Sequence, residues 1–414
     1  MSATETDEST GRLLLTLPAE LTERGTCPFA PPVGLTRLNT DGGLHRVATL
    51  DGEKIWLATG HEVARALLTD PRMSSDRTRS ETLMSRMSPT VRARLTDEKA
   101  RAGNFIGMDA PAHTRYRRLL TGQFTVRRMK ALAPRVEEIV TERLDAMVAA
   151  GPPADLVTAF ALPVPSLVIC ELLGVAYADR SSFQERSARL LNLNVPMAEA
   201  LRAIDELREF MRGLVREKRA HPADDMLSGL IAADAGLTDD DLVGISTLLL
   251  VAGHETTANM LALGTFSLLE HPEQLAALRA DPTLIASAVE ELLRYLSIVH
   301  VGLVRTALAD IEIGAEVITA GSLVQISIPA ANRDSQHYAD PDGLDVARPR
   351  GPHIAFGHGI HQCLGQQLAR VEMTVGFTEL LRRLPNLRLA AAPEEIPMRT
   401  DMAIYGVHSL PVTW

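Results

Sequence analysis

The sequence predicts a mainly α-helical protein that carries a few small β-sheets. Apolar residues recur every three to four positions over long stretches, which is the pattern of helices that bury one face. Segments with the two-residue alternation of strands are fewer and shorter. A length of 414 residues allows two or three domains. Because no internal repeat and no Ser-, Gly- or Pro-rich linker divides the chain, we expect one domain over 27–414, preceded by a polar extension over 1–26.

Helical periodicity covers five segments: 131–149, 205–219, 238–270, 283–296 and 364–384. Strands are expected in three places: 44–57, 304–328 and 410–414. The dipeptide Asp51-Gly52 favours a tight turn, so the first of these segments is predicted to be a hairpin.

The composition excludes several classes of protein. With 46% hydrophobic and 23% charged residues, the chain is not disordered as a whole. Its formal net charge of −10 argues against general nucleic-acid binding. An odd number of cysteines, 3, fits a reducing compartment. Neither a secretory signal nor a run of about 18 apolar residues is visible, so we expect a cytoplasmic protein without a membrane anchor.

The longest predicted helix, 238–270, would be a rod of about 50 Å. Thr238 and Asp241 form a capping-box pattern at its start. A polar interruption, Gly253-His254-Glu255-Thr256-Thr257, falls in its apolar middle. This interruption is a solvent-facing patch, a satisfied core network or a functional group. The zinc-protease pattern HExxH is ruled out because its fifth position is Ala258.

The sharpest local signal is the stretch 356–365, Phe-Gly-His-Gly-Ile-His-Gln-Cys-Leu-Gly, which precedes a predicted helix. Its three glycines permit a tight loop with unusual dihedral angles. The loop brings Cys363 to a helix N-terminus, where backbone N–H groups are expected to lower the pKa of the thiol from about 8.5. The thiolate would be a nucleophile or a metal ligand. The alternative, a buried structural cysteine, is weakened by the glycines and by His361.

This stretch resembles the haem-binding loop of the cytochrome P450 monooxygenases. Its six fixed positions would match by chance in about 10⁻⁵ of chains of this length. Four further segments resemble family motifs and occur in the family's order: 113–117, 252–257, 291–294 and 332–334. The resemblance covers about 27–414 and is closest to the soluble actinobacterial branch. It implies the haem-thiolate fold of the family, with the long central helix lying over the haem.

The resemblance implies haem b (iron protoporphyrin IX) as cofactor, with Cys363 as its iron ligand. A thiolate in that position favours cleavage of the O–O bond. Phe356 and Gly365 are expected to contact the haem. Two buried propionates demand cations. The residues that match the family's propionate partners are His113, Arg117, Arg305 and His361, of which the first two share one face of a helix that begins near Asp109 and Pro111.

Thr256 and Glu255 are expected to deliver protons during oxygen activation. The Thr256 hydroxyl is in reach of the Ala252 carbonyl, and such a bond bends a helix, while Gly253 removes bulk beside that carbonyl. Leu248, Val251 and Ala252 are expected to face the substrate, and Val299 is a further candidate wall of its pocket.

Two groups of charges have other expected roles. Glu291 and Arg294 match the family's ExxR motif and, with Arg348, are expected to form a buried network that fixes the fold. The stretch from Arg115 to Lys130 contains six basic residues and no acid, namely Arg115, Arg117, Arg118, Arg127, Arg128 and Lys130. It is either a solvated face or a docking surface for an acidic ferredoxin, extended by Arg382 and Arg383.

The resemblance thus implies a monooxygenase that inserts one oxygen atom of O2 into a small lipophilic molecule. Electrons would come from NAD(P)H through a ferredoxin reductase and a ferredoxin, and we expect a monomer. The apolar stretch 190–197 favours a bulky lipophilic substrate such as a macrolide or terpenoid, and the arginines of 72–101 are surface charges or contacts of an anionic one. The alternatives are a peroxide-driven or coupling haem enzyme and a non-catalytic haem sensor.

Overall fold

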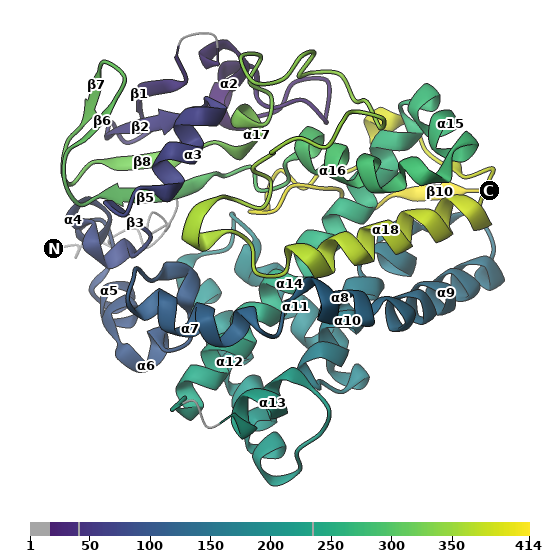
Figure 1. Cartoon of the computed structure of the whole chain (residues 1–414), viewed down its shortest axis with the longest axis horizontal. Helices are drawn as coiled ribbons and strands as arrows, with labels where there is room; N and C mark the ends of the chain where they lie inside the picture. Colours follow the sequence, from purple (N-terminus) through teal and green to yellow (C-terminus); the bar gives the residue numbers. More distant parts are fainter. Residues whose placement is uncertain (1–16, 40–41, 234–235) are drawn as a thin grey trace, which may run out of the picture.

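The computed structural model describes residues 17–39, 42–233 and 236–414. Figure 1 shows a helical body in the centre and to the right, and a mixed β-sheet with its covering helices at the upper left. The predicted class, mainly α with small sheets, is confirmed. No helix in the described part of the chain is long and apolar enough to cross a membrane.

The longest helix, α14 (Asp239–Leu269), runs through the helical body. Its start is the predicted one: the Thr238 hydroxyl accepts a hydrogen bond from Asp241 N at 3.1 Å, and the Asp241 carboxylate accepts from Thr238 N at 2.8 Å. This capping box satisfies two backbone donors that a helix start leaves free. The same carboxylate accepts from the Tyr116 hydroxyl and so ties α14 to α7 (Ala112–Thr121).

The other predicted helices are present with shifted ends. They are α9 (Ala133–Ala150), α12 (Met197–Ala220), α16 (Ile285–Leu296) and α18 (Gln366–Arg383). A helix that the periodicity did not predict, α10 (Pro163–Leu173), packs beside α14. It was missed because it is apolar and buried on nearly all sides and therefore shows no polar face.

Shorter helices surround this body. In the N-terminal half they are α1 (Ala19–Thr22), α2 (Val33–Leu38), α3 (His61–Thr69), α4 (Glu81–Ser85), α5 (Pro89–Thr96), α6 (Glu98–Arg101), α8 (Val126–Ala131) and α11 (Arg180–Leu191). In the C-terminal half they are α13 (Met226–Ala232), α15 (Pro272–Ala280), α17 (Ile328–Ala331) and the 3₁₀ turn η7 (Gly359–His361).

The largest sheet has the strand order β1-β2-β8-β5-β3. Its strands are β1 (Leu44–Ala48), β2 (Lys54–Ala58), β8 (Leu323–Ile326), β5 (Leu303–Ala307) and β3 (Met73–Ser74). β1 and β2 form the predicted antiparallel hairpin, in which Leu44 pairs with Ala58, and Gly52 in its turn has φ +84°. The remaining strands are β4 (Ala154–Asp155), β6 (Ile311–Ile313), β7 (Glu316–Ile318), β9 (Arg388–Leu389) and β10 (Pro411–Thr413).

Both faces of this sheet are covered. Trp56 and Ala58 of β2 belong to one hydrophobic cluster, while Ile55 and Leu57, which alternate with them along the strand, belong to another. This alternation follows from the two-residue period of a strand. Leu17 and Leu21 lie in the second cluster, so apolar residues that precede Cys27 pack against the sheet. The domain boundary at Cys27 stays a prediction, and residues 1–16 of the expected extension lie outside the described part.

Candidate functional site

The loop that carries Cys363 is fixed by close backbone contacts. Cys363 N donates to Phe356 O at 2.8 Å, which closes the loop. Gly357 and Gly359 have φ of +69° and +72°, a region that L residues with side chains rarely adopt. A Cβ at Gly359 would lie 2.4 Å from Leu68 O of α3. The loop therefore needs glycine at this position, and α3 determines where the loop lies.

The expected lowering of the Cys363 pKa is wrong for the protein alone. The net shift is upward because burial penalises the thiolate. The backbone N–H groups of Gly365 and Gln366 and the guanidinium groups of Arg117 and Arg370 act in the opposite direction, as expected of a helix start. Although it is closely surrounded, the Cys363 side chain remains accessible. A metal cation bound to this sulfur would add the positive charge that stabilises the thiolate, which these four groups do not fully provide.

The four predicted propionate partners gather beside this loop. The rings of His113 and His361 lie 4.2 Å apart, and Arg117 donates to Gln362 O next to Cys363. Burial, together with His113, Arg305 and Arg117, lowers the pKa of His361 to about 3. Burial also lowers the pKa of Arg305 to about 10. Basic side chains from α7, β5 and η7 thus converge beside the loop. Without a bound anion the pKa of each is lowered, so its charged form is disfavoured.

This cluster fits the haem that the resemblance implies. Both ring nitrogens of His113 and Nε2 of His361 are buried without a hydrogen-bond partner, an arrangement that costs free energy unless an anion or another polar group pairs with them. The carboxylate of Asp109, which lies just before α7, does not pair with these histidines. It accepts a hydrogen bond from Ser75 N at 2.8 Å. A Cβ at Gly365 would meet no protein atom within 4 Å, so no protein atom fills the space directly at this glycine.

A group of contacts that the sequence did not reveal supports the loop from α16. Glu290 accepts from Arg370 Nε at 2.6 Å and lies 3.0 Å from His353 Nε2. Burial opposes ionisation of Glu290, but its bonds to His353 and Arg370 outweigh it and lower its pKa to about 2. The Arg370 guanidinium lies 4.6 Å from the centre of the Phe356 ring. Phe356 is partly buried on the same core that α14 and α18 share.

The predicted Glu291–Arg294–Arg348 network is present and buried. Arg294 donates to both carboxylate oxygens of Glu291 at 2.7 Å, and Arg348 Nε donates to one of them at 3.1 Å. Arg294 also donates to Pro341 O at 2.7 Å and to Gly343 O at 3.0 Å. The network therefore joins α16 to the irregular segment before the Cys363 loop.

The buried middle of α14 has one accessible face. The predicted positions Leu248, Val251, Ala252 and Thr256 are partly or fully accessible, whereas most of their neighbours are buried. Their three- and four-residue spacing places them on the same side of the helix. Val299, which follows α16, is half-buried. α14 also packs against α18, which begins just after Cys363, through positions further along both helices such as Gly264 and Phe377.

The hydroxyl of Thr256 donates to Ala252 O at 2.9 Å, which is the predicted hydrogen bond. Glu255 is buried, and its carboxylate accepts from Arg399 at 3.0 Å. Gly253 also has a packing role, beside its expected one next to the Ala252 carbonyl. A Cβ there would lie 2.9 Å from the side chain of Ile169 on α10, so the glycine permits close helix packing. Arg399 could not be assigned from sequence because it lies far along the chain from Glu255.

The basic stretch divides into paired and unpaired residues. Arg115 donates to Gly236 O and Arg117 to Gln362 O, so both are engaged. Within the described part of the chain, no ion pair or hydrogen bond involves the side chains of the exposed residues Arg118, Arg127, Arg128 and Lys130. Arg382 and Arg383, the expected extension, are each paired with an acid on or near α18.

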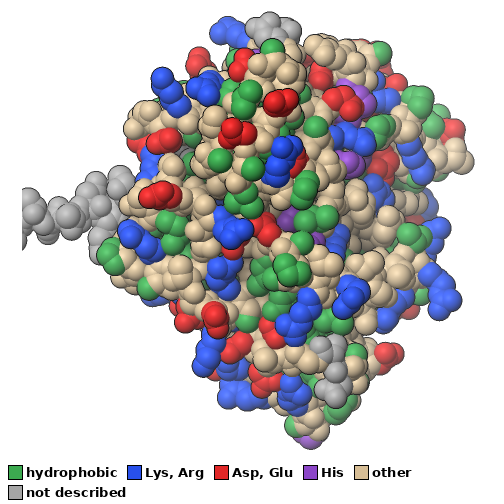
Figure 2. Space-filling view, turned by 60° about the vertical axis from the view of Figure 1, so that its left-hand side comes forward, with side chains coloured by type: hydrophobic (Ala, Val, Ile, Leu, Met, Phe, Trp, Pro, Cys, Tyr) green, Lys and Arg blue, Asp and Glu red, His purple; other side chains and the backbone are tan. Residues whose placement is uncertain are grey.

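Acids from inside and outside the arginine-rich segment 72–101 pair with several of its arginines. Four of its arginines form ion pairs, namely Arg72 with Asp70, Arg86 with Asp51, Arg94 with Asp205 and Arg101 with Asp76. Most of this excess is therefore surface charge that is already compensated. Figure 2 shows such mixing of Lys and Arg with Asp and Glu over one face of the molecule, with basic side chains more frequent toward its right-hand edge.

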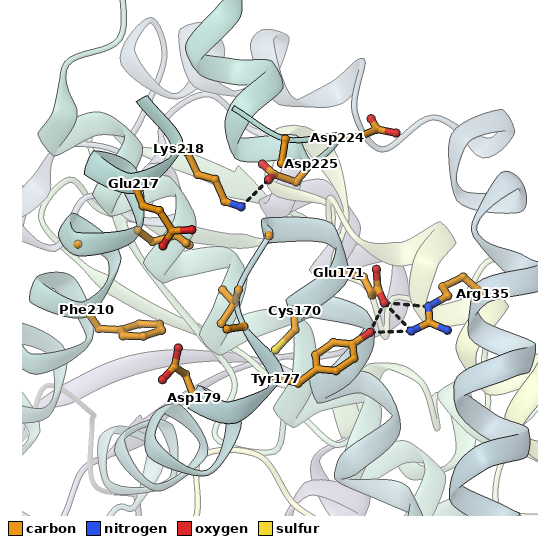
Figure 3. A pocket seen from close by; sticks show the side chains of 16 residues that line it. Arg135, Cys170, Glu171, Tyr177, Asp179, Phe210, Glu217, Lys218, Asp224 and Asp225 are labelled. Carbon is orange, nitrogen blue, oxygen red and sulfur yellow. Dashed lines mark hydrogen bonds and ion pairs between the residues drawn. The ribbon is translucent and has the colours of Figure 1, made fainter. Parts of the chain in front are cut away.

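A separate pocket of about 590 Å³ lies between α9, α10, α12 and the segment 223–225 that precedes α13. Figure 3 shows its two polar groups: Arg135, Glu171 and Tyr177 on one side, and the ion pair of Lys218 with Asp225 on the other. Cys170 forms part of its wall, and burial raises the pKa of this thiol to about 12. The pocket contains none of the predicted site residues.

Comparisons with known proteins agree with these features. The family model "Cytochrome P450" matches residues 80–402. The chain is 48% identical to pentalenic acid synthase of Streptomyces avermitilis over 96% of this chain and 98% of the relative. It is 46% identical to vitamin D3 dihydroxylase of Streptomyces griseolus over 94% and 95%. The crystal structure of CYP105P1 in complex with filipin I has 42% identity and a TM-score of 0.89, covering 97% of this chain and 99% of that one.

Proposed function

The chain belongs to the cytochrome P450 family of haem-binding monooxygenases, and on this premise we propose that it hydroxylates or epoxidises a bulky lipophilic small molecule with electrons from a ferredoxin and its NAD(P)H-dependent reductase. The observation that carries the proposal is the joint presence of an accessible Cys363 and an accessible face of α14 that ends in Thr256. A substrate on that face would meet mainly the apolar side chains of Leu248, Val251 and Ala252.

Each part of the site has its own task in this reaction. When bound, haem supplies the activation of O2 and the transfer of one oxygen atom. Cys363 would hold the iron, and His113, Arg117, Arg305 and His361 would hold the two propionates, the two histidines through nitrogens that are otherwise unpartnered. On the α14 side, Thr256 positions a proton beside the Ala252 carbonyl. Glu255 relays protons toward it from the Arg399 side.

The relatives support the lipophilic class of substrate and leave its identity open. A dihydroxylase of vitamin D3 and a structure with bound filipin I stand among them. The connection between α11 and α12 would form a lid over such a molecule. It is anchored where Leu193 N donates to Asp401 O at 2.7 Å and Ala403 N donates to Leu191 O at 2.8 Å. The proposal includes a cytoplasmic location, which the three free cysteines favour, and a monomeric state.

Replacing Thr256 by alanine should uncouple electron consumption from product formation. Proton transfer by a positioned group contributes roughly 10²–10⁴-fold, so we expect product per NAD(P)H to fall at least about tenfold while hydrogen peroxide release rises. Thr256→Ser keeps the hydroxyl and should restore most of the coupling. Normal coupling in Thr256→Ala would remove this residue from the proton path.

The unpaired basic residues should guide the ferredoxin. Charge reversal in Arg128→Glu should slow the first reduction of the haem at low ionic strength and leave substrate binding intact, because exposed charges act mainly on association. The same should hold for Arg127→Glu. Lys54→Glu, which reverses one charge on β2, is the matched control. Stopped-flow reduction and the spin-state titration of substrate measure the two properties. Equal reduction rates for all three variants would argue for a merely solvated face.

A further inference from the structure

A second cluster of metal-ligating side chains lies at the start of α3, outside the Cys363 site. His61, Glu62 and His337 each place one ligand atom within 4.8 Å of the other two. Imidazole nitrogen and carboxylate oxygen are ligands that Zn²⁺ takes in proteins. We propose that these three residues form a binding site for one divalent transition-metal cation, with Zn²⁺ as the best fit.

The hydrogen bonds of His61 determine which of its nitrogens is free. Nε2 lies 2.7 Å from Pro352 O, and because a carbonyl oxygen only accepts, Nε2 carries the proton. In the neutral ring, Nδ1 then presents a lone pair, and Glu62 Oε1 lies 3.1 Å from it. Two acceptors at this distance repel unless a proton or a cation sits between them. The His61 side chain is fully buried (0% exposed), so its ring is held in place by the surrounding chain.

The distances match those of a zinc site. Glu62 Oε1 lies 3.1 Å from His61 Nδ1 and 3.6 Å from His337 Nδ1. Tetrahedral Zn²⁺ with ligands at about 2.0–2.1 Å keeps ligand atoms about 3.3–3.4 Å apart. The two rings are stacked with centres 3.6 Å apart and an interplanar angle of 18°, so their in-plane lone pairs run nearly parallel. The His337 ring must therefore turn out of the stack to bind the same cation as His61.

The three ligands differ in freedom in a way that suits metal capture. His61 is held by Pro352, whereas the side chains of His337 and Glu62 are 24% and 77% exposed and can turn toward an ion. Because His337 and Glu62 are exposed to solvent, a water molecule can take the fourth coordination position of the ion. Two acids, Glu62 and Asp334, and one cation, Arg65, act on His337. Asp334 also accepts from His61 N at 2.8 Å and so fixes the first residue of α3.

The position of this cluster implies a structural role for the metal. His61 begins the helix whose Leu68 carbonyl lies against Gly359. Pro352, which accepts from His61, precedes the Cys363 loop by a few residues, and Tyr338 next to His337 donates to the same carbonyl at 3.1 Å. A bound cation would thus fasten α3 to the chain segment that enters the loop.

Equilibrium dialysis of the full-length holoprotein without an affinity tag, followed by metal analysis, tests the proposal. We expect one equivalent of Zn²⁺ per chain. His337→Ala and Glu62→Gln should each weaken Zn²⁺ binding more than tenfold, and Zn²⁺ should raise the thermal midpoint of the wild type but not of His337→Ala. His408→Ala, which breaks an exposed His–Asp pair of 2.7 Å elsewhere, should bind Zn²⁺ like the wild type.

The altered residues are partly or largely exposed, so the variants should fold. The absorption spectrum of each reduced variant under carbon monoxide checks this independently of zinc. Absence of stoichiometric uptake by the wild type, or equal uptake by the wild type and His337→Ala, would overturn the proposal. The cluster would then be a His61–Glu62 ion pair only, with Glu62 largely exposed.

Discussion

Cys363→Ser is expected to abolish monooxygenase turnover and the sulfur-ligated spectrum of the reduced protein under carbon monoxide. The side chain is accessible, and a ring of cations and N–H groups is already arranged around its charge. Replacing an outer partner of a metal ligand costs roughly 10–100-fold, and we expect a larger loss here because the ligand itself is removed. Turnover with a partner system and the carbon monoxide spectrum measure the two effects.

Cys27→Ser is the matched control for this experiment. Cys27 is also a free, accessible cysteine but lies outside the loop. We expect wild-type turnover and an unchanged spectrum for it. A Cys363→Ser variant that keeps the sulfur signature would exclude this thiol as the iron ligand, and with it the arrangement of the whole site.

Glu291→Gln is expected to cause the largest loss of stability among single substitutions at the site. The carboxylate receives three charged hydrogen bonds from Arg294 and Arg348 in a buried setting. Removing one partner of a buried ion pair costs about 3–5 kcal/mol because the other charge is left uncompensated. The free energy of unfolding from urea titration of the holoprotein, together with the fraction of chains that retain haem, measures the effect.

Glu379 and Arg382 provide a control with the same residue types and the same spacing. They form an i,i+3 pair on α18, but the Arg382 side chain is 66% exposed. Glu379→Gln should leave the unfolding midpoint unchanged, since water replaces the lost contact. Similar losses of unfolding free energy for Glu291→Gln and Glu379→Gln would mean that burial does not determine how much the Glu291 network stabilises the fold.

The sequence was most informative where a local pattern dictates local geometry. The glycines around Cys363, the capping box of α14 and the i,i+3 pair of α16 each depend on residues a few positions apart, and all three are present as predicted. The convergence of His113, Arg305 and His361 came from the family resemblance, because no spacing rule relates three separate elements.

The remaining features depend on contacts between distant parts of the chain. The upward pKa shift of Cys363 follows from how densely the loop is surrounded, which a helix-terminus argument does not capture. The partner of Glu255 is Arg399, and Glu290 finds Arg370 on another helix. The pairing of the arginines in 72–101 with acids such as Asp205 likewise appears only in the folded molecule.

The contact between Gly253 and Ile169 has a consequence for substrate range. With no side chain between them, α14 and α10 interlock over the stretch that flanks Thr256, and close-packed surfaces shift only at a cost. The wall that α14 forms beside Thr256 is therefore rigid, and every substrate must fit against it. Differences in substrate size must be accommodated by the shorter elements around 72–101 and 190–197. Substitutions in these segments should therefore change substrate specificity most readily.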